Sequence, residues 1–320
     1  GISQVVDVAG HDITHPLPAL PFDTPTFKRL YGQGVFVPGN ELLMGYTEEG
    51  DPQYRTPADI KSMAVAGWQG SGKTLSLAYI LTSAALLYPA CRIYVIDPHE
   101  GHKEGLGNLL RPLARTGRVK IVNPFDTSEL LDTLNAILDA RLAGEELPEP
   151  LIILAIDELA NLAKLDSFDR LLLFLERCTE ETRKANIVFF GCSQKWNARH
   201  FKGRADIRGS LPSLLVHRMK PSQAGLLLEQ GSHEEKRLLK HVIQPGTALL
   251  STSHDADPLV IKVPFICAED VRQVSERIVN GSSSVYHPTN AQERQGGMQT
   301  DPPVVSDREE IPIDQQVTVE

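Results

Sequence analysis

The sequence predicts an α/β fold in which a mainly parallel sheet carries helices on both faces. Between about residues 62 and 265, short apolar segments alternate with longer helical segments. The apolar segments are continuous rather than alternating, which is typical of strands buried on both faces. A glycine-rich turn follows the first of them. Strand–helix–strand alternation favours parallel strands joined by helical crossovers.

The elements follow from these patterns. A segment of 14 residues after the glycine-rich turn is mostly apolar, and the next predicted helix repeats leucines at spacings of three and four. The predicted strands are Ser62–Ala66, Arg92–Ile96, Val119–Val122, Leu151–Ile156, Ile187–Cys192, Leu214–His217, Ala248–Ser251 and Leu259–Val263, and the predicted helices are Thr74–Leu87, Ser128–Leu142 and Phe168–Lys184.

Residues 61–268 are therefore expected to form the main domain. Residues 1–60 are rich in proline and glycine, and they contain only short strand-like segments such as "GVFVPG" and "ELLMGY". We expect them to form a small β-rich or irregular extension. Residues 269–320 are expected to form a short helix and then a polar tail that is disordered, because that tail has few large apolar residues to bury.

The composition is that of a soluble globular protein, with 41% hydrophobic and 23% charged residues among 320. No segment approaches the roughly 18 apolar residues of a membrane span, and no signal peptide is visible. We therefore expect a cytoplasmic protein. The start at Gly1 leaves open a preceding segment with a membrane anchor. The four cysteines form no CxxC pair and predict reduced thiols in the core.

The charge is unevenly distributed. The net charge is −9, but residues 281–320 alone carry seven acids and two basic residues. Residues 195–220, in contrast, contain seven Lys or Arg residues and a single acid, Asp206. Overall acidity therefore does not exclude a local basic surface.

The segment "GWQGSGKT" is a complete Walker A motif between a predicted strand and a predicted helix. Its glycines let backbone N–H groups face phosphate oxygens, and the following helix presents its N-terminus to the same anion. Lys73 offers a cation to the β- and γ-phosphates, and the Thr74 hydroxyl is a candidate ligand of Mg²⁺. The expected ATP-binding residues are Gly67, Trp68, Gln69, Gly70, Ser71, Gly72, Lys73 and Thr74.

The segment "LIILAIDELANL" has the form of a Walker B motif, a buried strand that ends in two acids. Asp157 is expected to bind Mg²⁺ or its water, and Glu158 to activate the attacking water. The sequence lacks the Asn-Lys-x-Asp motif of GTPases and the "LSGGQ" signature of transport ATPases. ATP hydrolysis with Mg²⁺ is therefore the favoured reaction.

A third polar group is expected beside these acids. The strand in "NIVFFGCSQKW" ends at Ser193 and Gln194. If this strand neighbours the Walker B strand, the Gln194 amide lies beside the acid pair, where it can contact the γ-phosphate or the attacking water. Ordinary turn chemistry after a strand is the alternative interpretation.

The order of these motifs resembles the FtsK/HerA class of hexameric DNA-pumping ATPases, over roughly residues 41–265. "YVIDPHEG", "LAIDELANL", "TRKANIVFFGCSQKW" and "VIQPGTALLST" are similar to successive segments of that class. The resemblance implies a RecA-like P-loop NTPase that assembles as a hexameric ring on duplex DNA. It also implies that Lys73, Glu158 and Gln194 are catalytic.

The resemblance further implies an arginine that acts on a neighbouring subunit's site. Arg183 matches the class motif, and Arg177, Arg208 and Arg218 compete with it. The sequence departs from the class at several positions: Trp68 and Gln69 replace small residues, His99 replaces Lys, Ser193 replaces Thr, Lys195-Trp196 replaces Arg-Pro, and Leu214 stands where the class often has Arg.

The basic segment has two interpretations. Its cations, with Trp196 and Phe201 among them, could contact a DNA backbone without regard to base sequence, or they could form a solvated loop or a subunit interface. The candidate DNA contacts are Lys195, Arg199, Lys202, Arg204 and Arg208.

Three functions remain open at this point. The first is an ATP-driven translocase of double-stranded DNA that acts as an oligomeric ring. The second is a related conjugation-coupling or protein-export ATPase that moves single-stranded DNA or polypeptide. The third is a nucleotide-binding regulator that hydrolyses little ATP, against which the intact Asp157–Glu158 pair argues.

Overall fold

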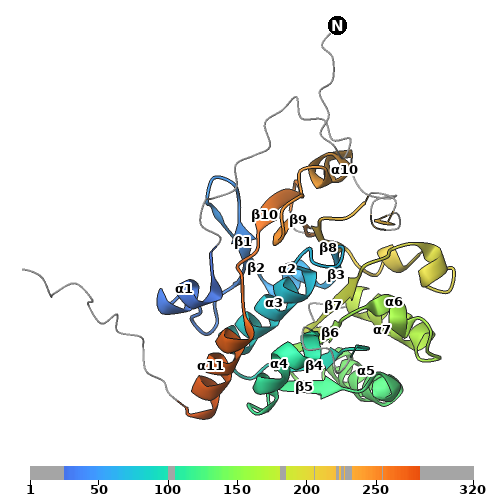
Figure 1. Cartoon of the computed structure of the whole chain (residues 1–320). Helices are drawn as coiled ribbons and strands as arrows, with labels where there is room; N and C mark the ends of the chain where they lie inside the picture. The colour runs from blue at the N-terminus through green and yellow to red at the C-terminus, as the bar shows by residue number, and fades with distance from the viewer. Residues whose placement is uncertain are drawn as a thin grey trace, which may run out of the picture. The chain divides into compact units, whose positions relative to one another are not determined.

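A ten-stranded mixed sheet organises the chain (Figure 1). The computed structural model describes residues 25–99, 105–180, 185–204, 206–220, 223–224, 227, 233–253 and 255–281. The strand order in the sheet is β2-β1-β10-β9-β8-β3-β7-β6-β4-β5. The strands are β1 (Leu42–Tyr46), β2 (Pro52–Arg55), β3 (Ser62–Ala66), β4 (Arg92–Ile96), β5 (Val119–Val122), β6 (Ile152–Ile156), β7 (Ile187–Ser193), β8 (Ser213–His217), β9 (Thr247–Ser251) and β10 (Leu259–Lys262).

The strands from β8 to β5 in this order are parallel to one another. β7 lies between β3 and β6, and it pairs Ser193 with Ala66 and Gly191 with Ile156. The carboxyl ends of β3, β6 and β7 therefore meet at one edge of the sheet. The predicted strands are confirmed, with ends that differ by no more than one residue. The predicted neighbourhood of the Walker B strand and the strand that ends at Ser193 is also confirmed.

The remaining strands are antiparallel and extend the same sheet. β1 comes from "ELLMGY" and pairs with β10 through Tyr46 and Lys262, so the described N-terminal residues belong to the main sheet. The segment "GVFVPG" forms turns rather than a strand. Its Phe36 ring packs on Phe27, with 4.8 Å between the ring centroids.

Helices cover both faces of the sheet, as predicted (Figure 1). Met63 and Val65 of β3 join a core with one group of helices, whereas Ala64 and Ala66 point to the other core. This is the two-sided burial that continuous apolar strands indicate. The first group is α1 (Phe27–Gly32), α3 (Lys73–Leu87), α4 (Leu106–Ala114) and α11 (Ala268–Val279), and the second contains α5 (Thr127–Ala143) and α7 (Phe168–Glu180).

Three other short helices complete the described secondary structure beside a few 3-10 turns: α2 (Pro57–Ile60), α6 (Leu159–Leu162) and α10 (His233–Leu239). Among the described helices, none combines the length and apolar composition needed to cross a membrane. The helix predicted to end at Lys184 is described as far as Glu180, and residues 181–184 lie outside the described part. The expected disordered tail from residue 282 also lies outside it.

Candidate nucleotide-binding and hydrolysis site

The turn after β3 has the backbone of a phosphate-binding loop. Gly72 has φ = 101°, a conformation that side chains other than glycine rarely adopt, and a Cβ there would lie 3.0 Å from the Gly246 backbone nitrogen. That nitrogen donates a hydrogen bond to the Ser71 carbonyl at 3.0 Å. A Cβ on Gly67 would lie 2.8 Å from the His217 Cβ. The two glycines are therefore required by close packing, of Gly72 against backbone and of Gly67 against side chains, as well as by the expected phosphate contacts.

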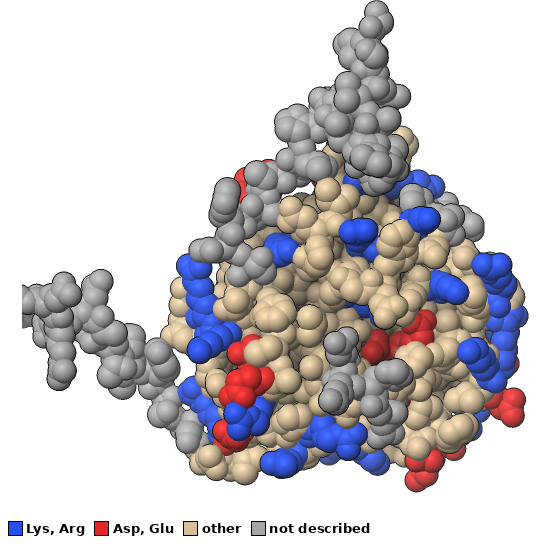
Figure 2. Space-filling model, in the orientation of Figure 1, with Lys and Arg blue, Asp and Glu red and all other residues tan. Residues whose placement is uncertain are grey.

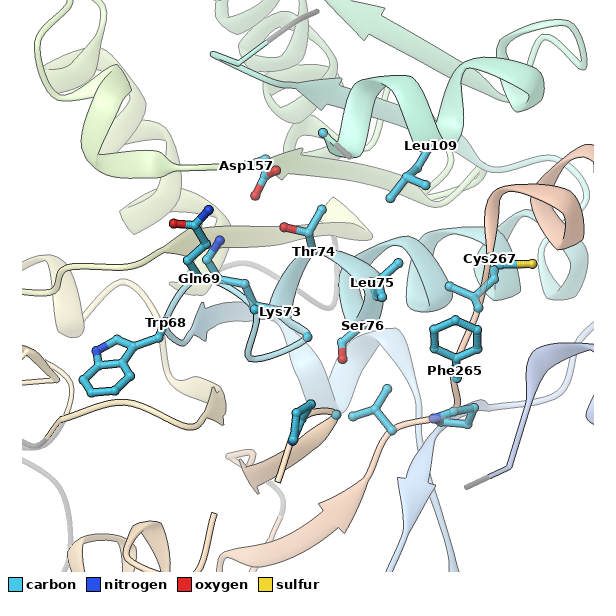
Figure 3. Close-up of a pocket in the computed structure, with 18 of the residues that line it drawn as sticks. Trp68, Gln69, Lys73, Thr74, Leu75, Ser76, Leu109, Asp157, Phe265 and Cys267 are labelled. Carbon is cyan, nitrogen blue, oxygen red and sulfur yellow. The ribbon is translucent and has the colours of Figure 1, made fainter. Parts of the chain in front are cut away.

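Helix α3 begins at Lys73, directly after the loop, so its unpaired N–H groups face the space above the loop. Its sides pack against the sheet and against α4, which explains why the helix is apolar all round. Figure 3 shows Lys73, Thr74 and Asp157 around the same space, with Gln69 beside them. The loop and the Walker B strand thus meet as the sequence predicted.

The acids of this edge differ in their partners. Asp97, at the end of β4, accepts hydrogen bonds from the His99 and Gly107 backbone N–H groups at 2.8 and 2.9 Å. It therefore fixes the start of α4. Asp157, at the end of β6, is 6% exposed, and one of its carboxylate oxygens has no hydrogen-bond partner in the described part of the chain. A buried carboxylate with an unused oxygen is suited to bind an ion or its water.

Charge and burial set the protonation of these groups. Burial acts to lower the pKa of Lys73, but the negative charges of Asp157 and Glu158 beside it act in the opposite direction, and the pKa is raised. Burial raises the pKa of the nearby Cys192 thiol well above 9, so this thiol is neutral at pH 7. The ammonium is therefore stabilised by the two carboxylates. Burial raises the pKa of Asp157, and Lys73 opposes that shift.

Glu158 is held at the wall of the site by the end of β7. The Ser193 hydroxyl donates a hydrogen bond to the Glu158 Oε1 atom at 2.6 Å, and the Gln194 backbone N–H contacts the same oxygen at 3.4 Å. Glu158 has φ = 64°, a left-handed conformation that costs about 1–3 kcal/mol in a residue other than glycine. Such strain and a fixed carboxylate are typical of a catalytic position.

These groups line one end of a cavity of about 1000 Å³. The polar end is formed by the loop, Asp157, Glu158 and Gln194. The other end is apolar, and it contains Leu75, Leu109 and the segment that joins β10 to α11. Figure 3 shows Phe265 of this segment beside Leu75 and Ser76, and its side chain is 48% exposed.

Sequence reasoning missed the apolar end of the cavity. Phe265 is fixed by backbone hydrogen bonds to the N-terminal segment: its N–H donates to the Pro25 carbonyl at 2.9 Å, and its carbonyl accepts from the Phe27 N–H at 2.7 Å. Thr26 lies between these residues and lines the cavity. Segments more than 230 residues apart thus build this wall, and neither carries a motif that could have predicted it.

The residues present fit a magnesium ion. Mg²⁺ is usually held by one or two protein oxygens, together with waters and substrate phosphates. The unpartnered Asp157 oxygen and the Thr74 hydroxyl, both in the wall of the cavity, could supply those oxygens. Within the described residues no three His, Cys, Asp or Glu side chains form a metal cluster, and Mg²⁺ needs none.

Most of the expected ATP-binding residues line the cavity. Trp68, Gln69, Gly70, Gly72, Lys73 and Thr74 contribute to its wall. Gly67 and Ser71 are buried beneath the loop. The expected catalytic residues Lys73, Glu158 and Gln194 also line the cavity. The fourth, Arg183, lies outside the described residues.

The competing arginines differ in their surroundings. Arg177 contacts Asn135 at 2.7 Å and pairs with Asp139. Arg208 donates to the backbone carbonyls of Leu211 and Leu227. Arg218 is exposed and lies over the indole of Trp68, 5.7 Å from the ring centroid. None of these positions identifies an arginine that acts on a neighbouring subunit.

The candidate DNA contacts separate into two groups. Lys195 and Arg199 are exposed, and so is Lys202, whose ammonium donates to the Leu165 carbonyl at 3.0 Å. Arg204 pairs with Asp169 and Glu176 at 3.6 and 3.8 Å, and Arg208 is held by backbone carbonyls as described. These last two arginines have roles within the fold, and we leave them out of the proposed DNA surface.

The aromatic residues of the same segment are core residues. Trp196 and Phe201 are both fully buried, and their ring centroids lie 5.3 Å apart. The Trp196 indole N–H donates to the Ser193 carbonyl at 3.1 Å. These two rings therefore pack inside the turn after β7, and their buried positions do not support the interpretation in which they contact DNA beside the cations.

Comparisons with known proteins agree with this geometry. The AAA domain family matches residues 59–198. Among solved structures, the chain is similar to EssC (ATPases 2 and 3) of Geobacillus thermodenitrificans, with a TM-score of 0.59, 16% identity, and coverage of 83% of this chain and 52% of that one. For the pCW3 conjugation coupling protein TcpA with ATPγS, the TM-score is 0.55 and the identity 20%, with coverage of 82% and 74%. For the cytoplasmic domain of the Thermomonospora curvata type VII secretion ATPase EccC, the TM-score is 0.55 and the identity 17%, with coverage of 76% of this chain and 32% of that one.

These similarities concern the fold. The chain spans 32% of the EccC chain and 52% of the EssC chain, so it corresponds to one part of each. No curated protein sequence matches. The expected P-loop NTPase fold, with a mainly parallel sheet and helices, is confirmed. The AAA domain match supports nucleotide binding and ATPase activity.

Proposed function

We propose that this chain is an ATP-hydrolysing motor of the FtsK/HerA class that translocates double-stranded DNA as an oligomeric ring, a hexamer by resemblance. The observation that carries the hydrolytic part is the convergence of Lys73, Thr74, Asp157, Glu158 and Gln194 on one cavity. The proposal places the motor in the cytoplasm.

The residues divide the reaction among them. Lys73 neutralises the β- and γ-phosphates, and the loop N–H groups bind their oxygens. Mg²⁺, held by Thr74 and Asp157, would neutralise charge that develops on the phosphates. Glu158 accepts the proton of the attacking water, and Gln194 contacts the γ-phosphate or that water. Ser193 keeps the Glu158 carboxylate in place through the 2.6 Å hydrogen bond.

The apolar end of the cavity is suited to the nucleobase. Phe265 presents an exposed ring in a wall that also contains Leu75, Leu109, Val263 and Ile266. An aromatic face stacks on a base without regard to its hydrogen-bonding edge. The triphosphate would then run from Phe265 toward Lys73 along the cavity.

The DNA surface of the proposal consists of Lys195, Arg199 and Lys202. Lys195 follows Gln194 directly, and all three cations are exposed. Contacts from such cations to a phosphate backbone do not depend on sequence, as a translocating motor requires. Because Ser193 and Gln194 contact Glu158, movement of this segment on DNA would change the position of the catalytic carboxylate.

The alternative within the same class is a motor that moves single-stranded DNA or a polypeptide. Two of the similar structures are a conjugation coupling protein and a secretion ATPase, which is why this alternative is kept. The two candidates share the hydrolytic site and differ in the polymer that stimulates it.

The test is ATP turnover measured without polymer, with duplex DNA, with single-stranded DNA and with an unfolded polypeptide. We expect stimulation by duplex DNA at low salt, loss of turnover in Lys73→Ala, and a larger mass in ATP than without nucleotide. Stimulation by single strands or polypeptide alone would favour the alternative cargo. Turnover that no polymer changes would contradict the motor, and tight ATP binding without phosphate release would favour a regulator.

A further inference from the structure

A second, smaller cavity lies next to the catalytic acid. It has a volume of about 330 Å³, on the order of ten water molecules at ~30 Å³ each. Its walls contain Asn161, Lys164, Lys195 and His200. Its walls also include His99, Glu158 and Gln194, all of which line the large cavity as well. These three residues therefore form the partition between the two spaces.

The smaller cavity is rich in positive charge. Lys164 and Lys195 line it and are exposed, and Glu158 is the only acid among the described residues of its wall. Arg199 adds a further cation, because its Nε contacts the His200 Nε2 atom at 3.3 Å. The pKa of His200 is lowered, first by partial burial and then by the charges of Arg199 and Lys195. Figure 2 shows Lys and Arg side chains along the right-hand edge of this face, over the yellow and yellow-green segments of Figure 1.

Hydrogen bonds fix some of these groups and leave others for a ligand. The Lys164 ammonium donates to the Asn161 Oδ1 atom at 3.0 Å, and Asn161 Nδ2 lies 3.1 Å from the His99 Nε2 atom. An ammonium has three N–H donors, so Lys164 keeps donors for another acceptor. Glu158 accepts a hydrogen bond from Ser193 on one oxygen, and within the described residues it forms no ion pair with Lys164 or Lys195.

The direction of hydrolysis points to this cavity. In an in-line displacement, the water oxygen bonds to the γ-phosphorus on the side opposite the bridging oxygen, and the bond to that oxygen breaks. The phosphorus therefore moves toward the water, which Glu158 positions. Because Glu158 and Gln194 form the partition between the two cavities, this direction would carry the cleaved phosphate away from ADP and toward the smaller cavity.

We propose that the basic cavity of Lys164, Lys195 and His200 is a phosphate-binding site that receives the cleaved inorganic phosphate after ATP hydrolysis and leads it to solvent. The inference rests on the proposed ATPase function. Lys195 would then serve phosphate release as well as any contact with DNA. The ligand class is a tetrahedral oxyanion, which a pair of ammonium groups and a neighbouring amide can bind.

The experiment compares the wild-type chain with the double variant Lys164→Ala/Lys195→Ala. Both lysines are exposed, so their truncation is not expected to unfold the protein. The matched control is Lys120→Ala, an exposed lysine of β5 that lines neither cavity. In the first titration, ADP with Mg²⁺ is added to each protein and its affinity is measured by calorimetry. In the second, inorganic phosphate is added to the ADP-loaded proteins, and its binding is measured from the ³¹P line width.

We expect ADP affinities within about twofold of one another, and phosphate affinity about tenfold lower in the double variant than in the wild type and the control, because two charge-assisted contacts are lost. Equal phosphate affinity in the wild type and the double variant, or no phosphate binding to the ADP-loaded wild type, would overturn the inference and leave the ATPase intact. Loss of DNA stimulation with unchanged phosphate affinity would assign the lysines to DNA instead. Failure of the wild type to bind ADP in the first titration would overturn the proposed function itself.

Discussion

Replacing Ser193 with alanine removes the hydroxyl that holds the catalytic acid. Ser193 is fully buried at the end of β7, and its hydroxyl lies 2.6 Å from the Glu158 Oε1 atom. A hydrogen bond to a charged group contributes about 1.5–3 kcal/mol. Glu158 is 9% exposed at the cavity wall, so water can replace part of that bond. We therefore expect a loss near the lower limit, about 1.5 kcal/mol.

This value predicts two measurable effects. The melting temperature should fall by about 3–6 °C, since 1 kcal/mol corresponds to about 2–4 °C in a domain of this size. The carboxylate should leave its catalytic orientation for most of the time, because about 1.4 kcal/mol is a tenfold change in an equilibrium. We expect kcat to fall about tenfold in Ser193→Ala, with little change in the KM for ATP.

Two variants control this experiment. Ser193→Thr keeps the hydroxyl and should retain most of the activity. Ser213→Ala removes a fully buried hydroxyl on the neighbouring part of the sheet that has no hydrogen-bond partner among the described residues, and it should leave kcat unchanged. Steady-state phosphate release and thermal melting measure the two effects. If Ser193→Ala has the same kcat and melting temperature as Ser213→Ala, the hydrogen bond does not position Glu158.

Two further predictions concern the ends of the site. Phe265→Ala should weaken ATP binding by about 5- to 150-fold, because stacking of a base on an aromatic ring contributes about 1–3 kcal/mol. Calorimetry should show no such loss for Leu147→Ala, a change at an exposed residue that lines neither cavity. If Phe265→Ala binds ATP as tightly as the wild type, the base binds elsewhere. Burial lowers the pKa of His217 from 6.5 to about 4, so the unfolded chain binds the proton first as the pH falls. The free energy of unfolding should therefore decrease between pH 6.5 and pH 4, by up to about 3 kcal/mol. In urea titrations at several pH values, His217→Asn should remove this part of the pH dependence. If the free energy of unfolding of the variant falls with pH as steeply as that of the wild type, His217 is not its cause.

The hydrolytic end of the site could be predicted from the sequence because its signals are local. Each of its segments follows a continuous apolar strand, and parallel strands bring their carboxyl ends to one edge. Gly72, Lys73 and Asp157 occupy fixed places in such segments. The prediction that Gln194 lies beside Glu158 depended on one assumption, that the strand ending at Ser193 neighbours the Walker B strand. β7 does pair with β6, as assumed.

The remaining parts of the structure depend on contacts that no local pattern encodes. Phe265 lines the cavity because residues 25–27 form hydrogen bonds on both sides of it. Trp196 lies in a segment of high charge, which suggested a surface position, yet its indole fills the turn after β7. Tyr46 joins the main sheet only because β10 offers it an antiparallel partner. In each case tertiary packing outweighed the local composition.

Glu158→Gln tests the assigned site most directly, because the amide keeps the size of the side chain and its hydrogen bond with Ser193 but cannot take a proton from water. ATP binding and phosphate release should be measured on this variant and on the wild type, each with and without duplex DNA. We predict that the wild type releases phosphate faster on DNA, and that the variant binds ATP with similar affinity and releases almost none. Phosphate release by Glu158→Gln at the wild-type rate would show that water is activated elsewhere.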